Sequence, residues 1–145
     1  MKIYLDTCSL QRPFDSKNQV RIILEAEAVL GILSYIESNK IELVNSDILK
    51  YEVENIPNSI RRNNSTSILE LAKSYIKVNA KIQKRAEVLV SFGIMSLDAL
   101  HLASAEYSEA DYFCTCDDKL VNKARKIDLT IKVVTPIELI GEIEK

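Results

Sequence analysis

The sequence predicts an α/β fold in which a parallel sheet is covered by helices on both faces. Short apolar segments alternate with longer segments of helical pattern along the 145 residues. This alternation is typical of parallel sheets, because a parallel strand is usually reached through a crossover helix. Only 3 Gly and 3 Pro are present, which favours long elements with short connections. The length, without a repeat or linker, indicates one domain over residues 1–145.

The first predicted elements are a strand, a loop and a long helix. Residues 2–6 have the pattern of a short strand that ends in an acid. Residues 7–18 contain a proline and several small polar side chains, which predict a loop. Apolar positions at helical spacing then predict a helix over about 19–38. Three charged residues interrupt its apolar stripe: Arg21, Glu25 and Glu37.

A second strand and a short helix are predicted next. The strand covers residues 41–45, and either Ser46 or Asp47 can cap the helix that runs to about Glu54. Pro57 limits this helix, because the residue before a proline disfavours helical backbone.

Three helices are predicted in the middle of the chain. Two of them cover residues 59–74 and 79–92, and Gly93 is expected to stop the second. Ser96 is expected to be the N-cap of the third, which holds Asp98 in its first turn.

Two more strands complete the predicted sheet, over residues 112–115 and 131–134. The first is followed by a helix that begins at Asp117 or Asp118. Pro136 suits the first turn of a last helix after the second strand, because its fixed φ fits that position.

Four acids are expected at the carboxyl edge of this sheet, where open parallel sheets bind their ligands. Asp6 ends the first strand, and Asp117 lies just past the third. Glu52 lies on the helix after the second strand, and Asp98 opens the buried helix that follows Ser96. Clustered ionised carboxylates repel one another, so we expect Mg²⁺ or Mn²⁺ among them, since both cations prefer oxygen ligands. A bound cation would activate water for phosphodiester hydrolysis.

The same four segments resemble, in order, the acidic motifs of the PIN domain family, including the VapC toxins. The resemblance spans nearly the whole chain. It is carried by residues 1–9 with Asp6, by Ser46 six residues before Glu52, by residues 96–103 with Asp98, and by the Thr-x-Asp of residues 115–117.

The resemblance implies a three-layer α/β/α fold with a parallel sheet of four to five strands. It also implies an Mg²⁺- or Mn²⁺-dependent endoribonuclease that cleaves RNA. Its catalytic and metal-binding residues would be Asp6, Glu52, Asp98 and Asp117. Many members of the family are toxins of type II toxin–antitoxin pairs and often dimerise, which implies an antitoxin protein as a partner and a homodimer.

Neighbouring polar residues are expected to support the four acids. Hydroxyl and acidic side chains beside the motifs would orient carboxylates or metal-bound water: Thr7, Ser9, Ser46, Thr115 and Asp118. Basic side chains near the same edge would meet RNA phosphates: Arg12, Lys17, Arg21 and Lys119. The single histidine, His101, lies three residues from Asp98 and can share its helix face. It can support a carboxylate there or pack as a hydrogen-bonded core residue.

The chain has three cysteines and a net charge of −2, and its composition limits the kinds of site that it can form. Cys8, Cys114 and Cys116 do not have the spacing of a zinc site, and we expect buried, unreactive thiols. The odd number of cysteines, without a leader or a long apolar run, predicts a cytoplasmic protein without a membrane span. Sparse aromatic residues argue against a stacking platform for bases.

Two alternative functions stay open, and two other classes of α/β protein are disfavoured by missing acids. The chain can be a non-catalytic interaction module of the PIN fold, or a nuclease that acts on DNA. A phosphatase of the haloacid dehalogenase type needs a second acid two residues after Asp6, where this chain has Cys8. A response-regulator receiver needs an acid at a central strand end, where this chain has Asn45 and Ser46.

Overall fold

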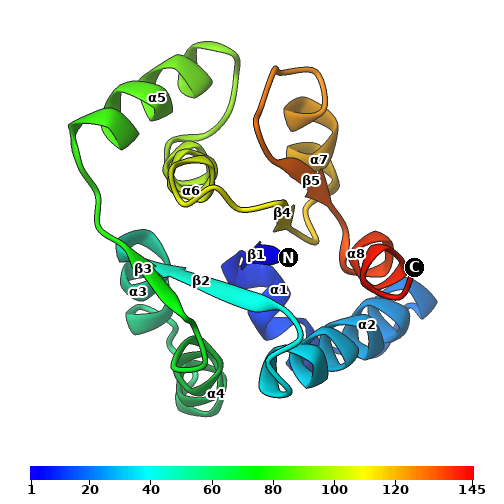
Figure 1. Ribbon diagram of the computed structural model, residues 1–145. Helices are drawn as coiled ribbons and strands as arrows, with labels where there is room; N and C mark the ends of the chain where they lie inside the picture. The colour runs from blue at the N-terminus through cyan, green and yellow to red at the C-terminus, as the bar shows by residue number, and fades with distance from the viewer.

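The computed structural model describes residues 1–145 and contains one parallel sheet of five strands (Figure 1). The strand order is β3-β2-β1-β4-β5, so β1 lies at the centre. The predicted α/β class with a parallel sheet is confirmed. The strands are β1 Lys2–Leu5, β2 Glu42–Ser46, β3 Ser74–Ile76, β4 Tyr112–Cys114 and β5 Lys132–Val134.

Helices cover both faces of this sheet and make the fold three-layered. Figure 1 shows α5 and α6 on one side of the sheet and α2 and α8 on the other. No helix is both long enough and apolar enough to cross a membrane. The α-helices are α1 Thr7–Gln11, α2 Val20–Glu37, α3 Asp47–Glu54, α4 Ser59–Leu69, α5 Ala80–Ser91, α6 Ser96–Tyr107, α7 Asp118–Ala124 and α8 Pro136–Ile143, and a 3₁₀ helix covers Arg12–Phe14.

The strand order reverses direction beside β1. The chain moves outward from β1 to β2 and β3, then crosses back to β4 on the other side of β1. The carboxyl ends of β1 and β4 therefore flank the crevice where sheets of this kind bind ligands. Leu5 is paired with Cys114, and the amide of Asp6 donates to the carbonyl of Cys114 at 3.1 Å. Asp6, which follows β1, therefore lies at this crevice beside the end of β4.

The predicted loop over residues 7–18 is wrong for residues 7–14, which form α1 and the 3₁₀ helix. The Asp6 carboxylate caps α1 by accepting from the amide of Ser9 at 3.0 Å. Pro13 lies in the first turn of the 3₁₀ helix, where its missing amide hydrogen costs no hydrogen bond. The acid that ends the strand therefore also begins a helix.

Two other sequence predictions need correction. The helix predicted over 59–74 ends at Leu69, and Ser74–Ile76 instead form the edge strand β3. Its hydrogen bonds to β2 outweigh the local helical pattern. The expected N-cap at Ser96 is also wrong, because Met95 holds that position without a side-chain capping bond.

A buried aromatic pair joins the two strands that flank the crevice. Tyr4 of β1 stacks on Phe113 of β4, with ring centroids 5.2 Å apart and planes 14° apart. Both side chains are fully buried. Since Tyr4 carries a hydroxyl, this part of the core must also supply hydrogen-bond partners.

Glu25 of α2 is a buried carboxylate rather than a surface charge in the apolar stripe. It is fully buried and pairs with Arg12 at 2.9 Å and with Arg21 at 3.4 Å. Arg12 also pairs with Asp15 at 2.9 Å. These contacts fix the segment after α1 against α2.

We predict that Glu25→Ala lowers the free energy of unfolding by about 3 kcal/mol, because it breaks a buried ion pair and leaves Arg12 undercompensated. The exposed Glu27 on the same helix is the matched control, and Glu27→Ala should change stability by less than about 0.5 kcal/mol. Urea denaturation of the three proteins measures both values. Equal losses for the two variants would show that the Glu25 pair does not stabilise the fold.

Candidate functional site

Asp6 is the most buried of the four acids, with 6% of its surface exposed. Its carboxylate accepts from the amide of Ser9 at 3.0 Å and from the thiol of Cys8 at 3.0 and 3.2 Å. Burial raises the pKa of Asp6, although hydrogen bonds from Thr115, Cys8 and Ser9 oppose that rise. The carboxylate is therefore held at a cost that its partners only partly offset.

Asp117 reaches the crevice from the adjacent strand end. It is the N-cap of α7, and Oδ1 accepts from the amides of Lys119 at 3.0 Å and Leu120 at 3.3 Å. Its own amide donates to the buried hydroxyl of Thr115 at 3.1 Å. The Thr115 hydroxyl also contacts the thiol of Cys8 at 3.5 Å, and that thiol donates to Asp6, so Thr115 and Cys8 together connect the two acids.

Asp98 lies in the first turn of α6 and is half-buried, and its carboxylate makes no hydrogen bond within the protein. Burial raises its pKa most. The negative charges of Asp6, Asp117 and Glu52 raise it further, while His101 lowers it. Four carboxylates from distant parts of the chain thus act on one another at this edge of the sheet.

Glu52 of α3 is held by two donors on the same oxygen. Its Oε1 accepts from the hydroxyl of Thr7 at 2.8 Å and from His101 Nε2. Burial by itself would raise the pKa of Glu52, but the bonds from His101 and Thr7 outweigh it and the pKa is lowered. Glu54, two residues further along, is exposed, as expected for positions on opposite sides of a helix.

The residues expected to support the acids have different partners. Thr7 donates to Glu52, and Thr115 helps to connect Asp6 with Asp117, as described above. Ser9 supports Asp6 through its amide, while its hydroxyl donates to the carbonyl of Cys114 at 3.1 Å.

Ser46 and Asp118 do not contact any of the four acids directly. The Ser46 hydroxyl caps α3 by accepting from the amide of Leu49 at 3.2 Å and contacts Tyr4 at 2.7 Å. Asp118 is exposed and forms an ion pair with Arg21, with Nη2 and Oδ1 2.6 Å apart. The Asp118 carboxylate, which was expected to orient a carboxylate or metal-bound water, is therefore paired with an arginine instead.

The histidine has two partners that the sequence does not reveal. His101 is 1% exposed, and its Nδ1 lies 2.6 Å from the hydroxyl of Tyr4, while Nε2 contacts Glu52. Both roles considered from the sequence apply, because the histidine is a packed core residue and also supports a carboxylate.

Most of the basic side chains near this edge are bound to other protein groups. Arg12 pairs with Glu25 and Asp15, and the Lys17 ammonium donates to the carbonyls of Pro13 at 2.7 Å and Asp15 at 2.8 Å. The exposed Lys119 side chain makes no hydrogen bond with the protein.

Arg61 of α4 pairs with Asp15 at 2.8 Å. It also donates to the carbonyl of Phe14 at 2.7 Å. This arginine of α4 therefore helps to fix the 3₁₀ segment beside the crevice.

The cysteines also differ from expectation at one position. Cys114 and Cys116 are buried, but Cys8 is exposed. Hydrogen bonding with Cys116 and burial of the sulfur raise the pKa of the Cys8 thiol. The group therefore stays protonated and can donate to Asp6.

The carboxylates fit a hard divalent cation by their chemistry. Their oxygens match the preference of Mg²⁺ and Mn²⁺, and a cation would offset both the burial and the neighbouring negative charges that raise the pKa of Asp98. No three His, Cys, Asp or Glu side chains lie together as a ready-made metal site. Mg²⁺ commonly keeps several water ligands, so some of these carboxylates would act on the ion through its bound water.

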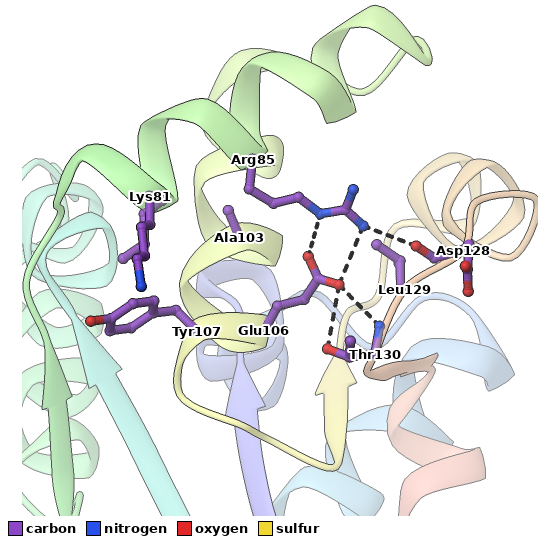
Figure 2. Close-up of a pocket in the computed structure, with 9 residues that line it drawn as sticks. Lys81, Arg85, Ala103, Glu106, Tyr107, Asp128, Leu129 and Thr130 are labelled. Atoms are coloured by element: carbon purple, nitrogen blue, oxygen red, sulfur yellow. Dashed lines mark hydrogen bonds and ion pairs between the residues drawn. The ribbon is translucent and has the colours of Figure 1, made fainter.

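A pocket of about 500 Å³ lies elsewhere, between α5, α6 and the loop before β5 (Figure 2). Its central acid, Glu106, accepts from Arg85 Nε at 2.7 Å and from the amide of Thr130 at 3.0 Å. Figure 2 shows these groups turned toward one another. Because their charges compensate internally and the pocket lies at the end of α6 away from Asp98, we assign it a structural role.

Comparison with known proteins identifies the family. The family model for the PIN domain matches residues 3–126, which is most of the chain. A solved structure described as VapBC2 from Rickettsia felis bound to a DNA fragment from their promoter contains a similar chain, 16% identical, with a TM-score of 0.58. The match covers 93% of this chain and 98% of that one, and at this identity it shows a common fold. No curated protein matches. The chain therefore belongs to the PIN domain family, whose members are generally nucleases.

Proposed function

We propose that residues 1–145 form a single nuclease domain, a metal-dependent endoribonuclease that hydrolyses phosphodiester bonds of RNA. The observation that carries this proposal is the convergence of four carboxylates at the crevice between β1 and β4. The charges of Asp6, Asp117 and Glu52 all raise the pKa of Asp98. Such an arrangement favours binding of a divalent cation, because the cation removes the repulsion.

Asp6, Asp98 and Asp117 would hold Mg²⁺ or Mn²⁺, and Glu52 would ligate it or accept the proton of the attacking water. When bound, such a cation makes water easier to deprotonate and stabilises negative charge on a phosphoryl oxygen. The lowered pKa of Glu52 keeps its carboxylate ionised. Thr7 and His101 fix its direction, and Thr115 helps to set the spacing of Asp6 and Asp117.

We further propose an antitoxin protein as a partner and a homodimer in solution. The similar chain from Rickettsia felis belongs to a complex called VapBC2, which is bound to promoter DNA. On α2 of this protein, Val20, Ile23 and Leu24 are apolar and 72%, 42% and 52% exposed. These side chains offer a surface that a protein partner can cover.

Nuclease activity tests the proposal directly. Purified protein should cleave single-stranded RNA with Mg²⁺ or Mn²⁺, and EDTA should abolish cleavage. Asp6→Asn and Glu52→Gln should each lower kcat/KM by about 100-fold or more, because the site loses transition-state stabilisation of several kcal/mol. Glu54→Gln is the matched control for Glu52→Gln and should retain activity.

Cleavage measured on labelled RNA and on DNA of the same sequence separates the alternatives. Cleavage of DNA alone would replace the proposed substrate. RNA cleavage that persists in EDTA and in Asp6→Asn would contradict the proposed site.

Stability without metal gives an independent prediction for Asp98. Its pKa in the folded protein is raised, so its ionisation destabilises the fold, and this loss grows as the pH rises through the range between its unfolded and folded pKa values. Asp98→Asn should therefore raise the melting temperature in EDTA at neutral pH. The gain should shrink at acidic pH, where the wild-type carboxyl is protonated.

Added Mn²⁺ should stabilise the wild-type protein more than Asp98→Asn. Scanning calorimetry in EDTA and in Mn²⁺ measures both effects, and Asp128→Asn, at an exposed acid outside the crevice, serves as a control. If Asp98→Asn melts below the wild type in EDTA at neutral pH, the cost of ionising Asp98 is not its main effect on stability.

A further inference from the structure

A chain of buried polar groups runs through the core to the proposed site. The Ser46 hydroxyl lies 2.7 Å from the Tyr4 hydroxyl, which lies 2.6 Å from His101 Nδ1, and His101 Nε2 contacts Glu52 Oε1. Ser46 and Tyr4 are fully buried, and His101 is 1% exposed. The groups come from β2, β1, α6 and α3, so the chain connects four elements.

Hydrogen-bond accounting fixes the direction of this chain. An ionised carboxylate only accepts, so Nε2 must carry a proton to bond Glu52. The Ser46 oxygen already accepts from an amide, and the Tyr4 oxygen is the only acceptor in reach of the Ser46 hydrogen. The Tyr4 hydroxyl hydrogen is then free to donate to Nδ1. Each hydrogen has one acceptor in this arrangement, whereas the reverse direction leaves the buried hydrogen of Ser46 without one.

We propose that His101 accepts from Tyr4 at Nδ1 and donates from Nε2 to Glu52, and that this Nε2–H arrangement positions Glu52 for the nuclease reaction. The catalytic part rests on the proposed function, whereas the tautomer is a property of the protein without metal. His101 is a positioning residue, because it acts through Glu52.

The geometry at Glu52 explains what this positioning achieves. Thr7 and His101 both donate to Oε1, and Oε2 makes no hydrogen bond with the protein. One oxygen is thus anchored, and the other is available to a cation or to a water proton.

The tautomer can be measured directly, because the chain contains a single histidine. Long-range ¹H–¹⁵N correlation spectra of the ¹⁵N-labelled, metal-free protein near neutral pH should show one ring with a protonated Nε2 and an unprotonated Nδ1. In Tyr4→Phe, Nε2 should stay protonated because Glu52 still accepts from it, and the Nδ1 resonance should shift because Nδ1 loses its hydrogen bond from Tyr4. A protonated Nδ1 in the wild type, as the other tautomer or as imidazolium, would overturn the proposal.

Kinetics test the positioning role. Tyr4→Phe keeps the ring that stacks on Phe113, and it should lower kcat by about 10-fold or more with little change in KM, as expected when the support of a ligand is lost. Tyr107→Phe is the control, because it removes a tyrosine hydroxyl at the far end of α6. His101→Gln, whose amide can donate to Glu52, should retain more activity than His101→Ala.

The outcomes separate the two proposals. An inactive wild type would refute the proposed nuclease, while the spectra would still decide the tautomer. An active enzyme whose kcat is the same in Tyr4→Phe, Tyr107→Phe and the wild type would refute the positioning role. Melting temperatures of all variants show whether a loss of activity reflects unfolding.

Discussion

The buried carboxylate of Asp6 at the end of the central strand is the constraint on which the rest of the site depends. The same group ends β1, caps α1 and contributes negative charge to the crevice. Its burial raises its pKa, so every further acid nearby adds repulsion. Amide, hydroxyl, thiol and imidazole donors hold three of the four carboxylates in place, namely Asp6, Asp117 and Glu52.

Each acid is held in a different way, and the differences suggest a division of roles. Asp117 is bound by the first amides of α7, and Glu52 by a hydroxyl and an imidazole. Asp98 has no protein donor. It is therefore the carboxylate whose energy depends most on a bound cation, whereas Glu52 has one oxygen anchored by two donors.

Much of the fold and the choice of the four acids could be predicted from the sequence, because strand ends, helix caps and helix faces are local properties. Asp6 was placed at a strand end by the apolar run before it, and Glu52 was identified by its spacing from Ser46. These local patterns did not reveal that Asp6 also starts a helix. It also missed β3, because a three-residue edge strand depends on its hydrogen bonds to β2 and not on its own pattern.

The remaining features depend on contacts between residues far apart in the chain. No local signal shows that Tyr4 meets His101, 97 residues later, or that Arg61 meets Asp15. The burial of Glu25 likewise follows from two arginines that fold onto it, one of them outside its helix. Such partners are set by tertiary packing, and sequence spacing alone does not reveal them.

Anomalous diffraction from a crystal soaked in Mn²⁺ tests the central claim most directly. A manganese peak is expected in the crevice between β1 and β4, within coordination distance of Asp6, Asp98 or Asp117, with Glu52 bound directly or through water. The absence of a peak there at saturating Mn²⁺, or a peak only at another acid such as Glu106, would contradict this claim.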